Sequence, residues 1–151
     1  MKQKEFVKAF LKDAVKSQIV TGVPLVVTLS QAALESGWGR YARGFNFFGI
    51  KVGSSWKGET QLLWTREFEK GKWKRVQAKF RKYNAPCQSF ADHGILLKKR
   101  WPNAFKFSDP EGFIRSVQFD HKYQYATDPD YVNKMISIIK KISKIITNME
   151  S

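Results

Sequence analysis

Glu35 is at a sequence position where an ionised carboxylate is unfavourable. It is predicted to occupy the last turn of a helix, just before Gly37 and Gly39, which stop helices. Unpaired carbonyls, the negative end of the helix dipole and water exclusion by Trp38 would each raise the pKa of the Glu35 carboxyl. A carboxyl group that keeps its proton near neutral pH is what a general acid for glycoside cleavage requires. Position alone leaves open a solvated surface glutamate in a frayed turn.

Hydrophobic periodicity predicts the elements that must position this side chain. Helices are predicted at 3–20, 24–36, 89–100, 110–119 and from about 130 onward, and strands at 60–68 and 73–80. The connection between the strands contains Gly71, which favours a β-hairpin, and residues 40–59 are predicted to form a structured loop. Segregated helices and hairpin indicate the α+β class. Without repeats or a linker, we expect a single domain over residues 1–151.

The charge of the chain indicates an anionic partner. Its 27 Lys and Arg against 13 Asp and Glu give a formal net charge of +14, which attracts nucleic acid, anionic membranes and anionic wall polymers alike. Neither an uninterrupted apolar signal segment nor a membrane-spanning run is present in the sequence. Either the protein leaves the cell by another route, or the sequence is a domain taken from a longer chain.

Cysteine and histidine usage does not favour a metal site. One Cys and two His are too few for a structural zinc site, and no phosphate-binding glycine loop or metal-ligand motif occurs. Cys87 follows Pro86 in a predicted turn and is interpreted as a bystander. We therefore expect no metal and no cofactor. The Asp92-His93 neighbours are interpreted as a structural hydrogen-bonding pair.

Short motifs occur in order along the chain: ALESGWG at 33–39, FNFFGIK at 45–51, WKG at 56–58, TREF at 65–68, FRKY at 80–83, SFADH at 89–93 and YATDPDY at 125–131. Together they resemble the bacterial glucosaminidase family, which includes the cell-wall domain of the flagellar rod-assembly protein and many autolysins. The resemblance covers roughly residues 5–145. The family often has Leu where Phe47 stands here, which is a conservative difference.

The resemblance implies a lysozyme-like α+β fold, with the hairpin lobe flanking a cleft, and hydrolysis of the β-1,4 bond following N-acetylglucosamine in peptidoglycan. Glu35 inherits the role of catalytic acid. Glycosidases usually pair two carboxyl groups, and Glu67 matches the acid that the family carries on the hairpin. Alternatively, Glu67 is an ion partner of Lys74 or another hairpin lysine. Glu59 and Glu69 stay open as other acids able to reach a cleft.

Tyr125 is the third predicted catalytic residue. The resemblance implies a role near the reacting sugar, and the alternative is packing of the last helix. Aromatic rings with an amide nearby suit the apolar faces and hydroxyls of sugars. The predicted substrate-binding residues are Trp38, Asn46, Phe47, Phe48 and Trp64, each of which has core packing as its alternative.

The function expected from the sequence is therefore an endo-β-N-acetylglucosaminidase. Its expected partner is the peptidoglycan glycan strand, with no nucleic acid and no membrane, and we expect a monomer. It would act at the bacterial cell wall, in the periplasm or outside the cell. The rivals are a lytic transglycosylase or muramidase on the same scaffold, a non-catalytic wall-binding module, and a nucleic-acid binder suggested by charge alone.

Overall fold

The computed structural model describes residues 1–150, so Ser151, the last residue of the predicted domain, lies outside the described part. The helices are α1 (Gln3–Thr21), α2 (Leu25–Ser36), α3 (Pro86–Arg100), α4 (Pro110–Phe119) and α5 (Tyr131–Met149). Two 3-10 helices, η1 (Arg43–Phe45) and η2 (Pro102–Lys106), lie in the connections, and β1 (Thr60–Glu69) pairs with β2 (Lys72–Arg81). The predicted α+β class is confirmed.

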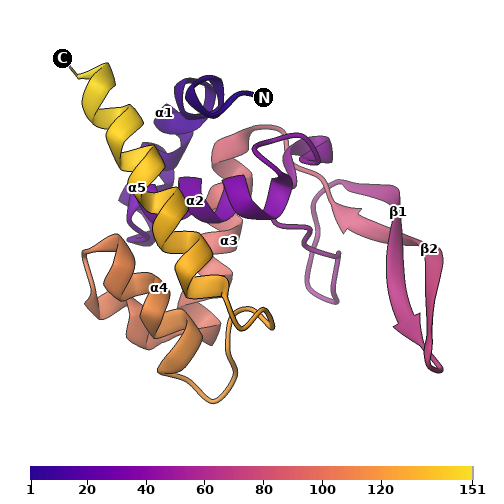
Figure 1. Cartoon of the computed structure of the whole chain (residues 1–151). Coiled ribbons are helices and arrows are strands. Elements are labelled where there is room, and N and C mark those ends of the chain that lie inside the picture. The colour runs from indigo at the N-terminus through magenta and orange to yellow at the C-terminus, as the bar shows by residue number, and fades with distance from the viewer. Residues whose placement is uncertain (151) are drawn as a thin grey trace.

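Helix α2 is the central element of the helical body. It packs against α1, α4 and α5, and most of its residues are buried. One apolar cluster joins it to α4 and α5 around Phe113 and Met135, and a second joins it to α1 and α3 around Phe6 and Phe90. In Figure 1, α2 runs behind α5 and between the other helices. Glu35 is thus fixed at the end of the most enclosed helix.

Local sequence signals place the helix ends. Gly22 and Gly37 close α1 and α2 in the left-handed region, with φ of 83° and 59°, which favours glycine. The Asp109 carboxylate caps α4 by accepting a hydrogen bond from the Gly112 N–H at 2.7 Å. These three helix boundaries match the sequence-based expectations. No helix within residues 1–150 combines the length and apolarity needed to cross a bilayer.

Helix α3 begins earlier than predicted. It starts at Pro86 rather than near Ser89, so Cys87 lies in the first turn of the helix and not in a turn before it. Proline suits a first helical position because its fixed φ is helical and its missing N–H is not needed there. The Cys87 N–H donates to the Asp13 carboxylate of α1 at 3.0 Å. This tertiary contact satisfies one of the free N–H groups at the helix start.

The hairpin is longer and its turn tighter than predicted. The ladder runs from Thr60 opposite Arg81 to Glu69 opposite Lys72, which leaves Lys70-Gly71 as a two-residue turn. Both turn residues have positive φ, 51° and 75°, as a hairpin turn that follows the strand twist requires. Figure 1 shows the hairpin projecting away from the helical body. The chain thereby forms a helical body, which includes α2 and Glu35, and a projecting hairpin.

Candidate active site

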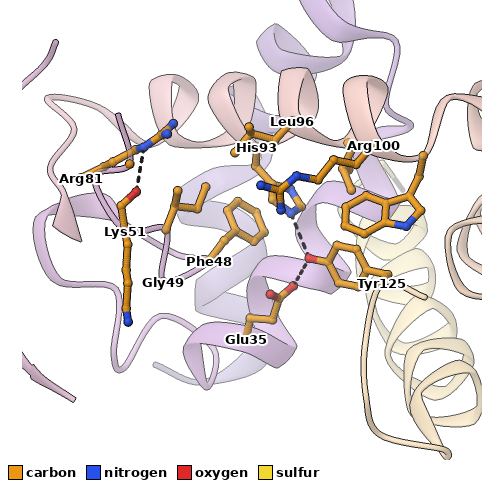
Figure 2. Close-up of a pocket in the computed structure, with 13 residues that line it drawn as sticks. Glu35, Phe48, Gly49, Lys51, Arg81, His93, Leu96, Arg100 and Tyr125 are labelled. Carbon is orange, nitrogen blue, oxygen red and sulfur yellow. Dashed lines mark hydrogen bonds between the residues drawn. The ribbon is translucent and has the colours of Figure 1, made fainter. Parts of the chain in front are cut away.

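Glu35 borders a cleft of about 480 Å³ on the hairpin side of the helical body. Its walls come from the loop after α2, with Phe48 and Gly49, from α3, with His93, and from Tyr125 in the segment before α5. Figure 2 shows the Glu35 side chain rising from the end of α2 toward Tyr125, with α3 above. The glutamate predicted from sequence to be catalytic therefore faces a cavity and not open solvent alone.

A second cavity of about 210 Å³ lies on the other side of Glu35. It is lined by the loop after α2 and by the base of the hairpin, including Leu63, Trp64 and Thr65. The two cavities share Glu35 and Gly49. The carboxyl group therefore stands where a chain-like ligand running along both cavities would pass it.

The pKa of Glu35 is raised to about 7, and the main cause is burial of its carboxyl group. The hydrogen bond from Tyr125 acts in the opposite direction because it stabilises the ionised form. The residue as a whole keeps substantial exposed surface, since it borders two open cavities. The expectation from sequence put the helix end first and exclusion of water by aromatic rings second, whereas burial, which is exclusion of water, is the main cause.

Tyr125 connects Glu35 to a buried histidine. Its hydroxyl donates to Glu35 Oε2 at 2.7 Å, and its oxygen lies 2.9 Å from His93 Nε2. Because a phenol has one hydrogen, His93 must donate from Nε2 in this arrangement. Burial lowers the pKa of His93 to about 3, so the ring is neutral at pH 7. The three side chains form a chain of hydrogen bonds that holds one carboxyl oxygen (Figure 2).

Aromatic stacking fixes this chain of hydrogen bonds. The Phe48 ring stacks on the His93 ring at 3.6 Å with only 7° between the planes. Trp101 packs against Tyr125 with 5.1 Å between the ring centroids and also borders the cleft. Phe48 was predicted to bind substrate, and it does line the cleft while supporting His93.

His93, Arg100 and Trp101 border the cleft but were not singled out from sequence as site residues. Asp92 and His93 were expected to bond to each other, and this expectation is wrong. Asp92 accepts hydrogen bonds from Arg81 and Tyr83, at 2.9 and 2.5 Å, while His93 turns toward Tyr125. Consecutive side chains on a helix point about 100° apart, so Asp92 and His93 could have been expected from the sequence to face different partners.

Glu67 borders neither cavity. Leu63, Thr65 and Glu67 lie on one face of β1, as alternation predicts, and the first two line the smaller cavity. The Glu67 carboxylate forms an ion pair with Lys51 of the loop, although Lys74 is opposite it in the ladder. Glu67 thus lies on the cleft-facing side of the hairpin, farther toward the tip, and its predicted role as the second carboxylate stays a prediction.

The other predicted sugar-binding residues differ in position. Trp64 is 56% exposed and borders the smaller cavity. Asn46 and Phe47 also border that cavity but are buried, and the Asn46 side chain bonds to backbone groups of Ile50 and Arg81. Trp38 packs edge-on against Phe6 in the core and borders neither cavity. Trp64 is therefore the best placed of these four to contact a ligand.

Three cationic residues take part in the lining of the larger cavity. Lys51, Arg81 and Arg100 border it, and Glu35 is the one acid among its described lining residues. Arg81 also fastens the base of the hairpin, because it donates to the Lys51 carbonyl at 3.1 Å and pairs with Asp92 of α3. Residues 1–150 contain no group of three or more His, Cys, Asp and Glu side chains placed to hold a metal ion. The site therefore combines cationic side chains, which suit an anionic ligand, with one carboxyl group, that of Glu35.

Comparison with known proteins places this arrangement among glycan-cleaving enzymes. The model of the glucosaminidase family, described as mannosyl-glycoprotein endo-beta-N-acetylglucosaminidase, matches residues 11–144. Peptidoglycan hydrolase FlgJ of Escherichia coli strain K12 is 35% identical over 149 residues, covering 91% of this chain and 47% of that protein. Exo-glucosaminidase LytG of Bacillus subtilis strain 168 is 36% identical over 125 residues, covering 76% and 43%. The chain thus spans less than half the length of these relatives.

Solved structures show the same fold. The glycoside hydrolase domain of Salmonella typhimurium FlgJ aligns with a TM-score of 0.86 and 30% identity, covering 99% of this chain and 94% of that one. The catalytic domain of the autolysin Auto from Listeria monocytogenes aligns with a TM-score of 0.80 and 26% identity, covering 93% and 84%. The resemblance noted from short motifs is therefore confirmed over nearly the whole chain.

Proposed function

This chain belongs to the glucosaminidase family, and from that premise we propose that it is an endo-β-N-acetylglucosaminidase of bacterial peptidoglycan. It would hydrolyse the β-1,4 bond following N-acetylglucosamine, at the cell wall, in the periplasm or outside the cell, and as a monomer. One observation carries the proposal beyond family membership. A carboxyl group with a pKa near 7 stands at the junction of two cavities that a glycan strand would cross.

Glu35 is the proposed general acid. At pH 7 about half of the Glu35 carboxyl groups carry a proton, which they would give to the oxygen of the leaving sugar. Tyr125 holds Oε2, which leaves Oε1 free to face the glycosidic oxygen. His93 positions Tyr125 through the contact of its Nε2 with the Tyr125 hydroxyl oxygen.

Glu67 is the proposed second carboxylate. It lies on the cleft-facing side of β1, and in the free protein Lys51 neutralises it. The hairpin is fastened to the loop after α2 and to α3 at its base, through Arg81, whereas toward the tip the ladder joins the two strands to each other, so closure over a bound glycan would be a movement of the part beyond the base. Closure would bring Glu67 toward Glu35, where it would activate water or stabilise positive charge on the sugar.

The cationic lining of the cleft suits the wall as a substrate. Peptidoglycan carries carboxylates on its stem peptides, and the Arg100 side chain borders the larger cavity. The net charge of +14 would speed capture of anionic strands and make activity fall as salt rises.

A lytic transglycosylase is the second candidate, and one observation favours it. Glu35 is the one acid bordering either cavity among the described residues. A transglycosylase needs a single acid because the substrate closes on itself to give an anhydro-muramic end. Participation of the N-acetyl group would likewise let a hydrolase work with one carboxylate.

A digest of purified sacculi with mass analysis of the new chain ends tests the proposal. We expect reducing N-acetylglucosamine ends with the wild-type protein and at least a thousandfold slower release with Glu35→Gln. Glu111→Gln is the control, because Glu111 is exposed on α4 and pairs with Arg115, away from the cleft. Anhydro-muramic ends or reducing muramic ends would contradict the assignment. Full activity of Glu35→Gln would remove that residue from the mechanism.

A further inference from the structure

The hairpin exposes large apolar side chains on the face opposite to that of Leu63, Thr65 and Glu67. Leu62, Trp64, Phe68 and Trp73 are 60%, 56%, 62% and 63% exposed. Alternation puts Leu62, Trp64 and Phe68 on one face of β1, and the ladder sets Trp73 opposite Phe68. Several large apolar side chains exposed together on one face of a protein usually mark an interaction site.

Cations interleave with these apolar side chains. Arg66 and Arg75 lie opposite each other in the ladder and share the same face. The Arg75 guanidinium lies 4.4 Å from the centroid of the Trp64 ring, and Arg66 lies 5.5 Å from that of Trp73. We call Leu62, Trp64, Arg66, Phe68, Trp73 and Arg75 the hairpin outer face. It contains no acid, and residues 60–81 as a whole hold seven Lys and Arg against two Glu.

The charge and the ring contacts argue against two possible occupants. A second copy of this chain would bring an equally cationic hairpin against the first, and like charges repel. A guanidinium group lies over the ring of Trp64 and another over that of Trp73, which leaves less of each ring on which a sugar or nucleotide base could stack. A partner that contacts the apolar side chains and also carries negative charges for the neighbouring arginines fits this face better than either of these two.

We propose that the hairpin outer face binds the surface of an anionic lipid bilayer. Tryptophan favours the headgroup region because its ring is largely apolar and its N–H is polar, and phenylalanine and leucine enter the apolar side of that region. Phe68 and Trp73 flank the Lys70-Gly71 turn and pack at 5.4 Å, so they would enter first, at the end of the projecting hairpin (Figure 1). Arg66 and Arg75 would then meet lipid phosphates.

This association is with a surface and needs no spanning helix. It departs from the sequence-based expectation of no membrane partner, because the alternation of apolar and cationic side chains becomes a surface only once the hairpin forms. Trp64 also borders the smaller cavity, so a docked hairpin would hold the cleft beside the bilayer. The binding itself does not depend on the proposed enzymatic function.

Co-sedimentation with lipid vesicles tests the proposal. We expect the wild-type protein to sediment with phosphatidylglycerol vesicles and not with phosphatidylcholine vesicles. Phe68→Ser combined with Trp73→Ser should lower the bound fraction at least fivefold. The matched control is Ile19→Ser with Val20→Ser on α1, which removes two apolar residues that are even more exposed, at 80% and 72%. Binding should survive in this control.

A second pair of variants separates the hairpin outer face from net charge. Arg66→Gln with Arg75→Gln should weaken binding to phosphatidylglycerol vesicles several-fold more than Lys140→Gln with Lys141→Gln on exposed positions of α5, although both remove two charges. Equal losses in the two pairs would overturn the proposal. Unchanged vesicle binding by the variant with Phe68→Ser and Trp73→Ser would also overturn it. The same holds if this variant loses binding to purified sacculi but keeps its binding to vesicles.

Discussion

The phenol hydroxyl of Tyr125 donates a 2.7 Å hydrogen bond to Oε2 of Glu35, a residue 90 positions earlier in the chain. This bond ties the segment before α5 to the end of α2 across the cleft. It fixes the orientation of the carboxyl group and lowers its pKa, against the larger effect of burial, which raises it. Orientation and proton affinity of the proposed acid are therefore set by the same partner.

Tyr125→Phe should move the pH profile. A general acid works when protonated, so wild-type kcat/KM should fall as the pH rises through about 7. Removing a bond that lowers the pKa of Glu35 should shift this alkaline limb to higher pH, while activity at its optimum falls about tenfold through lost orientation. Initial rates on soluble glycan from pH 5 to 9 give both effects. If the alkaline limb of the pH profile does not move in Tyr125→Phe, the ionisation of Glu35 does not determine that limb.

His93 should act as a positioning residue. His93→Phe keeps an aromatic ring against Phe48 but removes the donor to Tyr125, so we expect kcat to fall about tenfold with little change in KM. His93→Gln can donate from its amide and should recover part of the rate. Steady-state kinetics of both variants, with thermal melts to compare their stability, test this role. Equal losses of rate in the two variants would indicate packing alone.

Glu67 should matter if the hairpin closes on substrate. Glu67→Gln removes the proposed base while keeping the shape of the side chain, and we expect at least a hundredfold lower kcat. Glu69→Gln, two residues along the same strand, is the matched control and should keep most activity. A wild-type rate in Glu67→Gln would support assistance by the N-acetyl group instead.

Glu35 should reduce stability at alkaline pH. Its folded pKa of about 7 exceeds the ordinary value of 4.5, so the folded protein holds this proton more tightly than the unfolded chain. Stability from this group is complete below about pH 4.5 and is lost as the pH rises to about 7. Glu35→Gln should therefore raise Tm by roughly 1–3 °C at pH 8 and have little effect at pH 4.5. Thermal melts at the two pH values test the sign, and a lower Tm at pH 8 would contradict it.

Local signals predicted most of the secondary structure. Gly22 and Gly37 end helices because positive φ suits glycine, and Asp109 caps α4 through a contact three residues away. Where local and tertiary effects compete, prediction was weaker. The start of α3 was placed three residues late because the N–H of Cys87 finds its partner on α1, which no local pattern reveals.

The candidate site was predicted unevenly for the same reason. Glu35 and Tyr125 were identified from motifs, and the structure brings them into contact. Trp38 follows Glu35 closely in sequence yet packs on Phe6 in the core. His93 was set aside as structural because its sequence neighbour is Asp92, but its contact in space is Tyr125.

The sequence by itself determined the family, the helix end that carries Glu35 and the hairpin that carries Glu67, because short motifs, periodicity and turn residues are local properties of the chain. Only the tertiary structure decided that burial, more than the helix end, raises the pKa of Glu35, that Lys51 holds Glu67, and that aromatic and cationic residues form one outer face. Hydration and ion pairing depend on what lies within a few ångströms, and the chain brings those groups together from distant positions.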